Sequence, residues 1–134
     1  MDIYQKIRRI LVGILLVNML ALLLAGKSFE LFPYPGISAV TEEFFKFGGA
    51  AFVSSTMHEW HPLIPFSLST LFGLSEYGIW VYSGRGTPRE RIPALLVHTI
   101  TGISYGLFWR RNAYGKAPAL LLSILIHLWF NMNA

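Results

Sequence analysis

The sequence predicts an all-α membrane protein, a polytopic bundle of about five antiparallel transmembrane helices. Its composition is the first indication, because 54% of the 134 residues are hydrophobic and only 13% are charged. The second is that the apolar residues come in helix-length runs. The third is that basic residues gather at the ends of these runs, where lipid headgroups are expected. The length suits one domain, so we treat residues 1–134 as a single membrane domain.

The first apolar segment covers residues 10–25 and follows the basic stretch 6–9. A cleaved secretory signal peptide has similar flanks, but residues 22–25 offer no small-x-small cleavage site. We therefore expect an uncleaved N-terminal anchor span. Gly26 and the turn-forming stretch 33–36 are expected to end it.

Four further spans are expected at about residues 38–56, 63–82, 92–109 and 118–132, and together they form a four-helix core, residues 38–134. Turns containing proline or glycine separate them, and short turns make successive helices antiparallel. With alternating spans, six basic residues lie on the side of the N-terminus and four on the other. This excess favours a cytoplasmic N-terminus.

Each core span carries polar or ionisable side chains at a depth where lipid should exclude them. A charged group costs about 2.5–3.5 kcal/mol at the centre of a membrane helix. At a rise of ~1.5 Å per residue, alternating spans bring these groups into one layer, about 6–10 Å below the face opposite the N-terminus. In chain order these groups are Glu42, Glu43, Lys46, Glu76, His98, His127 and Asn131. Of these, we expect five to converge in one water-accessible cavity: Glu42, Glu76, His98, His127 and Asn131.

These residue types at one depth are the components of a hydrolytic site. A buried glutamate can act as general base towards water, and histidine or asparagine can donate hydrogen bonds to a developing oxyanion. Each motif also has a structural explanation. Glu42 and Lys46 are spaced for an i,i+4 salt bridge, and His127 with Asn131 can be a packing pair.

A second polar cluster, His58, Glu59 and His61, lies between the second and third segments. Its spacing does not match His-Glu-x-x-His, which places two imidazoles on one helix face. We interpret it as a solvated loop on the opposite side from the layer. The chain has no cysteine, which excludes disulfides, a thiolate nucleophile and a cysteine-based zinc site. No basic patch interleaved with aromatics indicates nucleic-acid binding.

Four motifs in order resemble the glutamic intramembrane proteases: Glu42-Glu43-x-x-Lys46, Phe72-x-x-x-Glu76, an isolated His98 and His127-x-x-x-Asn131. The PrsW branch is the most similar. The neighbouring branch of CAAX prenyl endopeptidases and bacteriocin-immunity proteins has an arginine where this chain has Phe47. That branch has histidine or arginine where this chain has Glu76. The resemblance covers residues 38–134, and this chain is shorter than typical PrsW proteins.

The resemblance implies a prokaryotic, multi-pass plasma-membrane enzyme that hydrolyses a membrane-anchored protein or peptide without a covalent intermediate, a metal or a cofactor. It implies that Glu42 is the base for water, tuned by Glu43 and Lys46. Glu76 and His98 would orient water or transfer protons. His127 and Asn131 would polarise the scissile carbonyl.

Two other functions fit the same residues. Carboxylate and imidazole groups from several helices can bind zinc, as in a metal-dependent membrane hydrolase. Buried glutamate, histidine and lysine also form proton relays in non-enzymatic membrane subunits and proton-coupled carriers.

Overall fold

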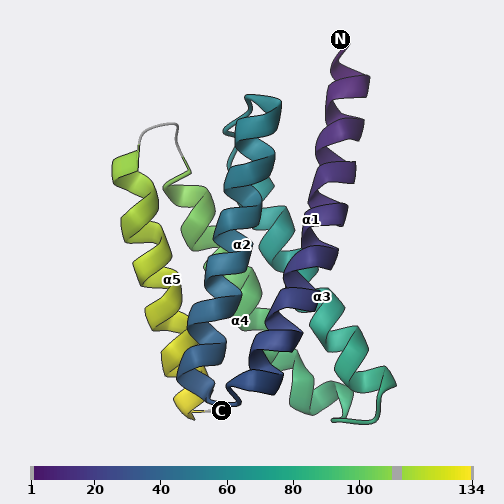
Figure 1. The fold of residues 1–134 in the computed structure, drawn as a ribbon, viewed down its shortest axis with the longest axis vertical. Coiled ribbons are helices and arrows are strands. Elements are labelled where there is room, and N and C mark those ends of the chain that lie inside the picture. Colours follow the sequence, from purple (N-terminus) through teal and green to yellow (C-terminus); the bar gives the residue numbers. More distant parts are fainter. Residues whose placement is uncertain (1, 110–112, 134) are drawn as a thin grey trace.

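The structure of the protein, a computed structural model, describes residues 2–109 and 113–133. Of residues 113–115 it describes the backbone alone. The described part of the chain forms five α-helices and no strand, which confirms the all-α part of the prediction (Figure 1). The helices are α1 (Ile3–Leu31), α2 (Pro35–Met57), α3 (Leu63–Tyr82), α4 (Pro88–Leu107) and α5 (Ala113–Asn133).

The predicted helix boundaries hold best for α3 and least for α1. The third segment, 63–82, matches α3 at both ends. Gly26 was expected to end the first helix, and this is wrong, because α1 continues to Leu31. One glycine costs a helix about 1 kcal/mol, too little to stop 29 residues. The break comes instead at residues 32–34, immediately before Pro35 begins α2.

Helix α4 begins four residues earlier than predicted because its start is well capped. The Thr87 hydroxyl accepts a hydrogen bond from the Glu90 backbone N–H, and the Glu90 carboxylate accepts one from the Thr87 N–H. This reciprocal pair is a capping box, and Pro88 occupies the first helical position. The helix therefore includes Pro93 rather than starting beside it.

The five helices alternate in direction, so the two termini lie at opposite ends of the bundle (Figure 1). Helix α2 packs against α1, α3 and α5, and α4 packs against α3 and α5. The α1–α2 and α3–α4 connections lie at the same end as the C-terminus, called here the C-terminal end.

Helix α1 is packed into the bundle. Its Asn18 side chain donates a hydrogen bond to the Ser75 hydroxyl at 3.1 Å, and Ala21 and Ala25 pack against the buried ring of Phe72. The first segment is therefore part of the helical domain and packs on the helices of residues 38–134.

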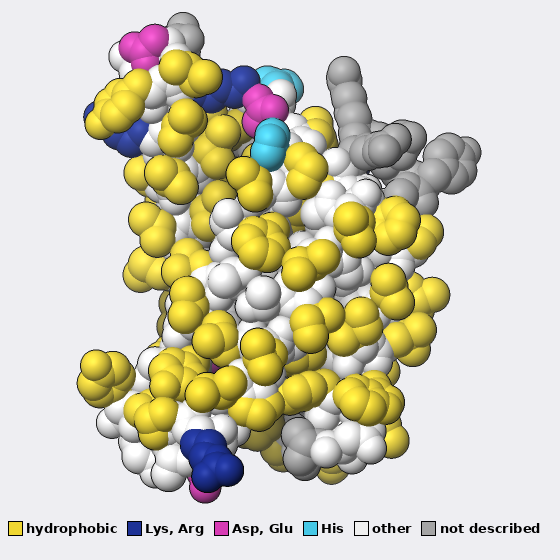
Figure 2. Space-filling view, turned by 180° about the vertical axis from the view of Figure 1, so that it is seen from behind, with side chains coloured by type: hydrophobic (Ala, Val, Ile, Leu, Met, Phe, Trp, Pro, Cys, Tyr) yellow, Lys and Arg dark blue, Asp and Glu magenta, His cyan; other side chains and the backbone are white. Residues whose placement is uncertain are grey.

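The outer surface is largely apolar, and every helix exposes large hydrophobic side chains. On the face seen in Figure 2, these side chains cover the middle of the molecule, and most of the charged and histidine side chains in view lie at its two ends. By length and composition, α1 is the one described helix apolar enough to cross a membrane. The other four carry polar or charged residues that dilute their apolar runs, so helix composition does not by itself establish the five predicted spans.

Candidate functional site

A cavity of about 560 Å³ opens between the helices at the C-terminal end of the bundle. The five side chains expected to meet in one cavity all line it: Glu42, Glu76, His98, His127 and Asn131. The cavity also lies at the predicted end, opposite the N-terminus. The predicted convergence is therefore confirmed, whereas the chemical roles of these residues stay predictions.

Glu43 and Lys46 lie behind the cavity, in the interior of the bundle. Both side chains are at most 1% exposed, and Lys46 Nζ is 2.8 Å from Glu43 Oε2. The Tyr105 hydroxyl donates to the other carboxylate oxygen, Oε1, at 2.9 Å. Lys46 Nζ also lies within hydrogen-bonding distance of Ser69, Thr101 and His98, at 2.8–2.9 Å. A buried charge needs such partners, and here they come from three helices.

Glu42 faces the cavity and is held from three sides. Its Oε2 atom lies 3.2 Å from His127 Nε2 and accepts a 3.4 Å hydrogen bond from the Ser38 hydroxyl. Its carboxyl group also lies close to that of Glu76, across the same cavity. Two carboxyl groups at close range repel each other when both are ionised, so sharing one proton favours the pair.

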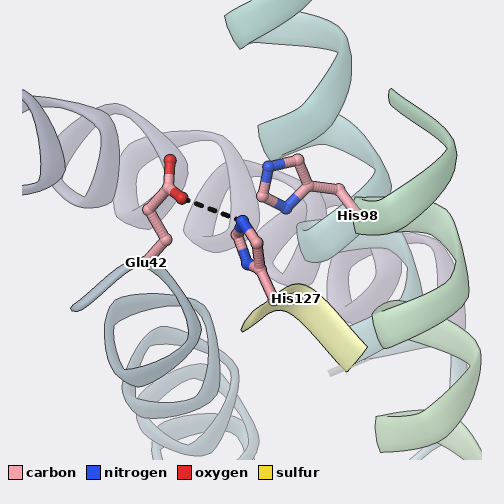
Figure 3. A group of neighbouring side chains, drawn as sticks. All are labelled: Glu42, His98 and His127. Atoms are coloured by element: carbon pink, nitrogen blue, oxygen red, sulfur yellow. Dashed lines mark ion pairs between the residues drawn. The ribbon is translucent and has the colours of Figure 1, made fainter. Parts of the chain in front are cut away.

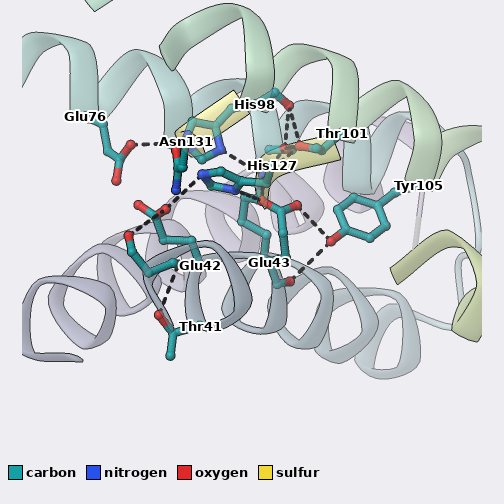
Figure 4. Close-up of polar contacts among 12 residues, drawn as sticks. Thr41, Glu42, Glu43, Glu76, His98, Thr101, Tyr105, His127 and Asn131 are labelled. Atoms are coloured by element: carbon teal, nitrogen blue, oxygen red, sulfur yellow. Dashed lines mark hydrogen bonds and ion pairs between the residues drawn. The ribbon is translucent and has the colours of Figure 1, made fainter. Parts of the chain in front are cut away.

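Five contacts join six acidic and basic side chains in series, and the first and last of them, Glu42 and Glu76, lie close together; we call these six residues the acid–base ring (most are labelled in Figure 4). The remaining contacts are His127 Nδ1 to Glu43 Oε2 at 2.6 Å and His98 Nε2 to Glu76 Oε2 at 3.0 Å. In order, the ring consists of Glu42, His127, Glu43, Lys46, His98 and Glu76, and Glu76 lies close to Glu42.

The hydrogen bonds of the ring assign the proton on His98. An ammonium group only donates, so His98 Nδ1 must accept from Lys46 at 2.8 Å. Nε2 of the neutral ring then carries the proton and donates it to Glu76.

His127 has carboxylates at both of its ring nitrogens. Glu43 already accepts from Lys46 and Tyr105, so His127 Nδ1 donates to it. The Nε2 atom faces Glu42, and the proton between these two atoms can reside on either. The contact between Glu42 and His127 is therefore a position beside the cavity where a proton can transfer.

Asn131 reaches the cavity without joining the ring. Its side-chain amide donates to the Pro35 carbonyl at 3.1 Å, which ties the end of α5 to the start of α2. An asparagine amide has two N–H donors, so one remains for a ligand in the cavity.

Sequence reasoning listed the charged members of the site but missed the hydroxyl groups Ser38, Ser69 and Tyr105 as partners. Helical spacing could have found two of them. Ser69 lies seven residues before Glu76, and Tyr105 lies seven residues after His98, so each shares a face with a listed residue. The contribution of α1 to the cavity wall, through Leu22 and Phe29, has no comparable sequence signal.

Three cavity side chains could together hold a metal ion. Glu42, His98 and His127 are all buried, and each offers one possible ligand atom (Figure 3). These three atoms lie within 4.8 Å of one another. Two imidazoles and a carboxylate are a ligand set found in zinc hydrolases. Binding would require His98 to release Glu76 or Lys46, because both of its nitrogens are already engaged.

The cluster of His58, Glu59 and His61 lies at the other end of the bundle, as predicted for a solvated loop. Both histidines are exposed. The Lys6 ammonium, 2.5 Å from Glu59 Oε2, lowers the pKa of that carboxyl through a hydrogen bond and its charge. This pair ties the start of α1 to the α2–α3 loop.

We expect Gly73→Ala to disturb His98. A β-carbon at Gly73 would lie 2.8 Å from the His98 β-carbon, so α3 and α4 must separate or the imidazole must move. Such overpacking costs about 1–3 kcal/mol. Gly78→Ala is the matched control, because it lies on the same helix with nothing within 4 Å of the added carbon. In detergent, the midpoint temperature of unfolding should fall for Gly73→Ala and should not fall for Gly78→Ala. Equal midpoints in the two variants would contradict the close packing.

Comparison with protein-family models, curated proteins and solved structures finds no match to this chain. Its function has to be inferred from its own residues and geometry.

Proposed function

We propose that this protein is an intramembrane endopeptidase of the glutamic type, which hydrolyses a peptide bond in a membrane-associated polypeptide. The observation that supports this most is the acid–base ring beside a cavity in an apolar helical bundle. The motif order, which resembles that of PrsW proteins, is a second and independent support.

The membrane setting is part of the proposal. Large apolar side chains are exposed on all five helices, and such surfaces are rare on soluble monomers. Helices α2–α5 would cross the bilayer with α1, because their polar residues face one another inside the bundle rather than lipid. Lys6, Arg8 and Arg9 favour a cytoplasmic N-terminus, which puts the cavity near the extracytoplasmic face.

In this proposal Glu42 is the general base. It borders the cavity, and its contacts with His127 and Glu76 provide two routes by which it can lose a proton before water arrives. The Glu42 carboxylate removes a proton from water while the oxygen attacks the scissile carbonyl carbon. Glu43 does not touch this water, since its side chain is fully buried and its oxygens are occupied by Lys46, Tyr105 and His127. It holds His127 in place.

The second half of the reaction needs a proton on the leaving nitrogen and a donor to the oxyanion. Glu42 returns the proton, directly or through His127 Nε2, so that the C–N bond breaks to give a carboxylic acid and an amine. Because both nitrogens of His127 face carboxylates, we assign the oxyanion contact to the remaining N–H of Asn131. One such donor is worth about 2.7–4 kcal/mol in related chemistry.

The test is cleavage of transmembrane peptides by purified, lipid-reconstituted protein, with products identified by mass spectrometry. We expect cuts within or beside the hydrophobic segment, and inactivity of Glu42→Gln. A folded protein that cleaves none of a diverse peptide set would contradict the proposal. Proton flux in liposomes that depended on Glu42 would then favour the proton-relay alternative.

A metal-dependent hydrolase is the second candidate, favoured by the proximity of Glu42, His98 and His127. We expect carboxylate-activated water instead, because Lys46 and Glu76 already occupy the two nitrogens of His98. Purified protein should then hold far less than one zinc per chain, and chelators should leave cleavage intact. One metal per chain, with activity lost on chelation and restored by zinc, would reverse the assignment.

A further inference from the structure

Two arginines line the outer part of the same cavity. Arg85 lies in the α3–α4 loop and Arg91 in the first turn of α4, and both line the cavity that Glu42 and Glu76 line. Neither belongs to the acid–base ring. Among the described residues, no carboxylate lies within ion-pair distance of either guanidinium group.

The Arg91 guanidinium is held in a fixed position. Its Cζ atom lies 4.4 Å from the centre of the Trp80 ring, and its Nη2 atom donates to the Arg85 carbonyl. Gly86 packs against it so closely that a β-carbon there would overlap Nε. Arg85 also lies over the Trp80 ring, with Cζ at 5.2 Å. Cation–π contacts of this kind orient a guanidinium and leave its in-plane donors for a ligand.

The protein leaves the hydrogen-bonding capacity of Arg91 unfilled. Its Nε atom is buried and has no acceptor. The acids that line the cavity make their ion pairs with other residues, Glu42 and Glu76 with the histidines and Glu30 with Lys27, and the charge of Arg91 reaches Glu76 only at longer range. Two cations that line a cavity of about 560 Å³, with no described carboxylate within ion-pair distance, are complementary to an incoming anion.

We infer that Arg85 and Arg91 form a substrate subsite for a carboxylate, supplied by an acidic side chain of the polypeptide that enters the cavity. This inference rests on the proposed peptidase function, because the occupant is the substrate. Arg91 and His98 are seven residues apart on α4, about 10 Å along the axis. An extended peptide covers that distance in about three residues, and the backward tilt of helical side chains adds to it. The acidic residue therefore lies about three to five residues from the scissile bond.

The test is a set of cleavable peptides that carry one aspartate at successive distances from the cut site, each paired with its asparagine twin. For wild type, the aspartate peptide at the best position should have a KM about tenfold below that of its twin, with similar kcat. Arg91→Gln should remove this difference without changing KM for the asparagine peptide. Arg91→Glu should invert it in favour of a lysine peptide.

Arg89→Gln is the matched control. Arg89 is an exposed arginine on the same turn of α4 and does not line the cavity. The Arg89→Gln variant should retain the preference for the aspartate peptide. Gly86→Ala keeps every charge but displaces Arg91, and it should weaken the preference as Arg91→Gln does.

Three results would overturn the inference. Arg91→Gln could weaken aspartate and asparagine peptides equally, or Arg89→Gln could act as Arg91→Gln does. The effect could also follow the content of anionic lipid rather than the peptide, which would indicate a headgroup site. A peptide with a free terminal carboxylate, compared with its amide, shows whether the chain end can supply the group instead.

Binding separates failure of this inference from failure of the peptidase proposal. Polarisation of a labelled aspartate peptide on the Glu42→Gln protein requires no cleavage. Arg91-dependent binding without turnover in wild type would retain the anion subsite and refute the peptidase. Turnover without any aspartate preference would retain the peptidase and refute the anion subsite.

Discussion

Glu42→Gln should lower peptide cleavage by about 10²–10⁴-fold, the range that general bases supply. Glutamine keeps the size of the side chain and can still accept from Ser38 and donate to His127, so the bundle should stay folded. What it loses is the capacity to take a proton from water. The measurement is kcat in lipid or detergent, together with size-exclusion and circular dichroism profiles.

Glu59→Gln is the control for this substitution. Glu59 lies at the far end of the bundle and pairs with Lys6, so removing its charge should leave cleavage unchanged. Full activity in Glu42→Gln would remove Glu42 as the base. Loss of folding in that variant would indicate that the ring is structural.

Lys46→Met should have the largest effect on stability of any single substitution discussed. It leaves Glu43 buried without its cation and removes a donor from His98, Ser69 and Thr101. Breaking a buried ion pair on one side costs about 3–5 kcal/mol. Unfolding of the protein in mixed detergent micelles, followed by circular dichroism, measures the loss.

The chain contains a matched control for Lys46→Met. Lys27 and Glu30 have the same three-residue spacing as Glu43 and Lys46 but are exposed, and their pair should contribute at most about 1 kcal/mol. Lys27→Met should therefore change the free energy of unfolding very little. The double variant Glu43→Gln/Lys46→Met should recover part of the stability lost in Lys46→Met, since no unpaired charge remains. Equal losses in the two lysine variants would contradict the buried ring.

The sequence was sufficient to predict the helices and the depth of the polar residues. Each apolar run has a clear length, and alternation of direction follows from short connections, so Glu42 and His127 could be expected to meet although 85 positions separate them. The helix ends were less predictable. A few hydrogen bonds decide that α4 begins after Thr87 and that α1 continues through Gly26, and hydropathy does not report on them.

The pairing within the site could not be predicted. Spacing suggested that Glu42 and Lys46 form an i,i+4 pair, but Lys46 pairs with Glu43 and contacts His98. Which of two adjacent glutamates faces the interior depends on how α2 is rotated against α4 and α5. That rotation is set by the packing of all five helices, which a one-dimensional pattern does not record.

The position of His127 on the last helix has a consequence for synthesis. Chains are made from the N-terminus, so Glu42, Glu43 and Lys46 are made well before their partner on α5. Until residue 127 has been added and α5 has docked, Glu43 lacks one hydrogen-bond donor and the cavity lacks one wall. The full set of contacts around Glu42 and Glu43 therefore cannot form until α5 has been made and has docked, so assembly of the fold determines when the site is complete.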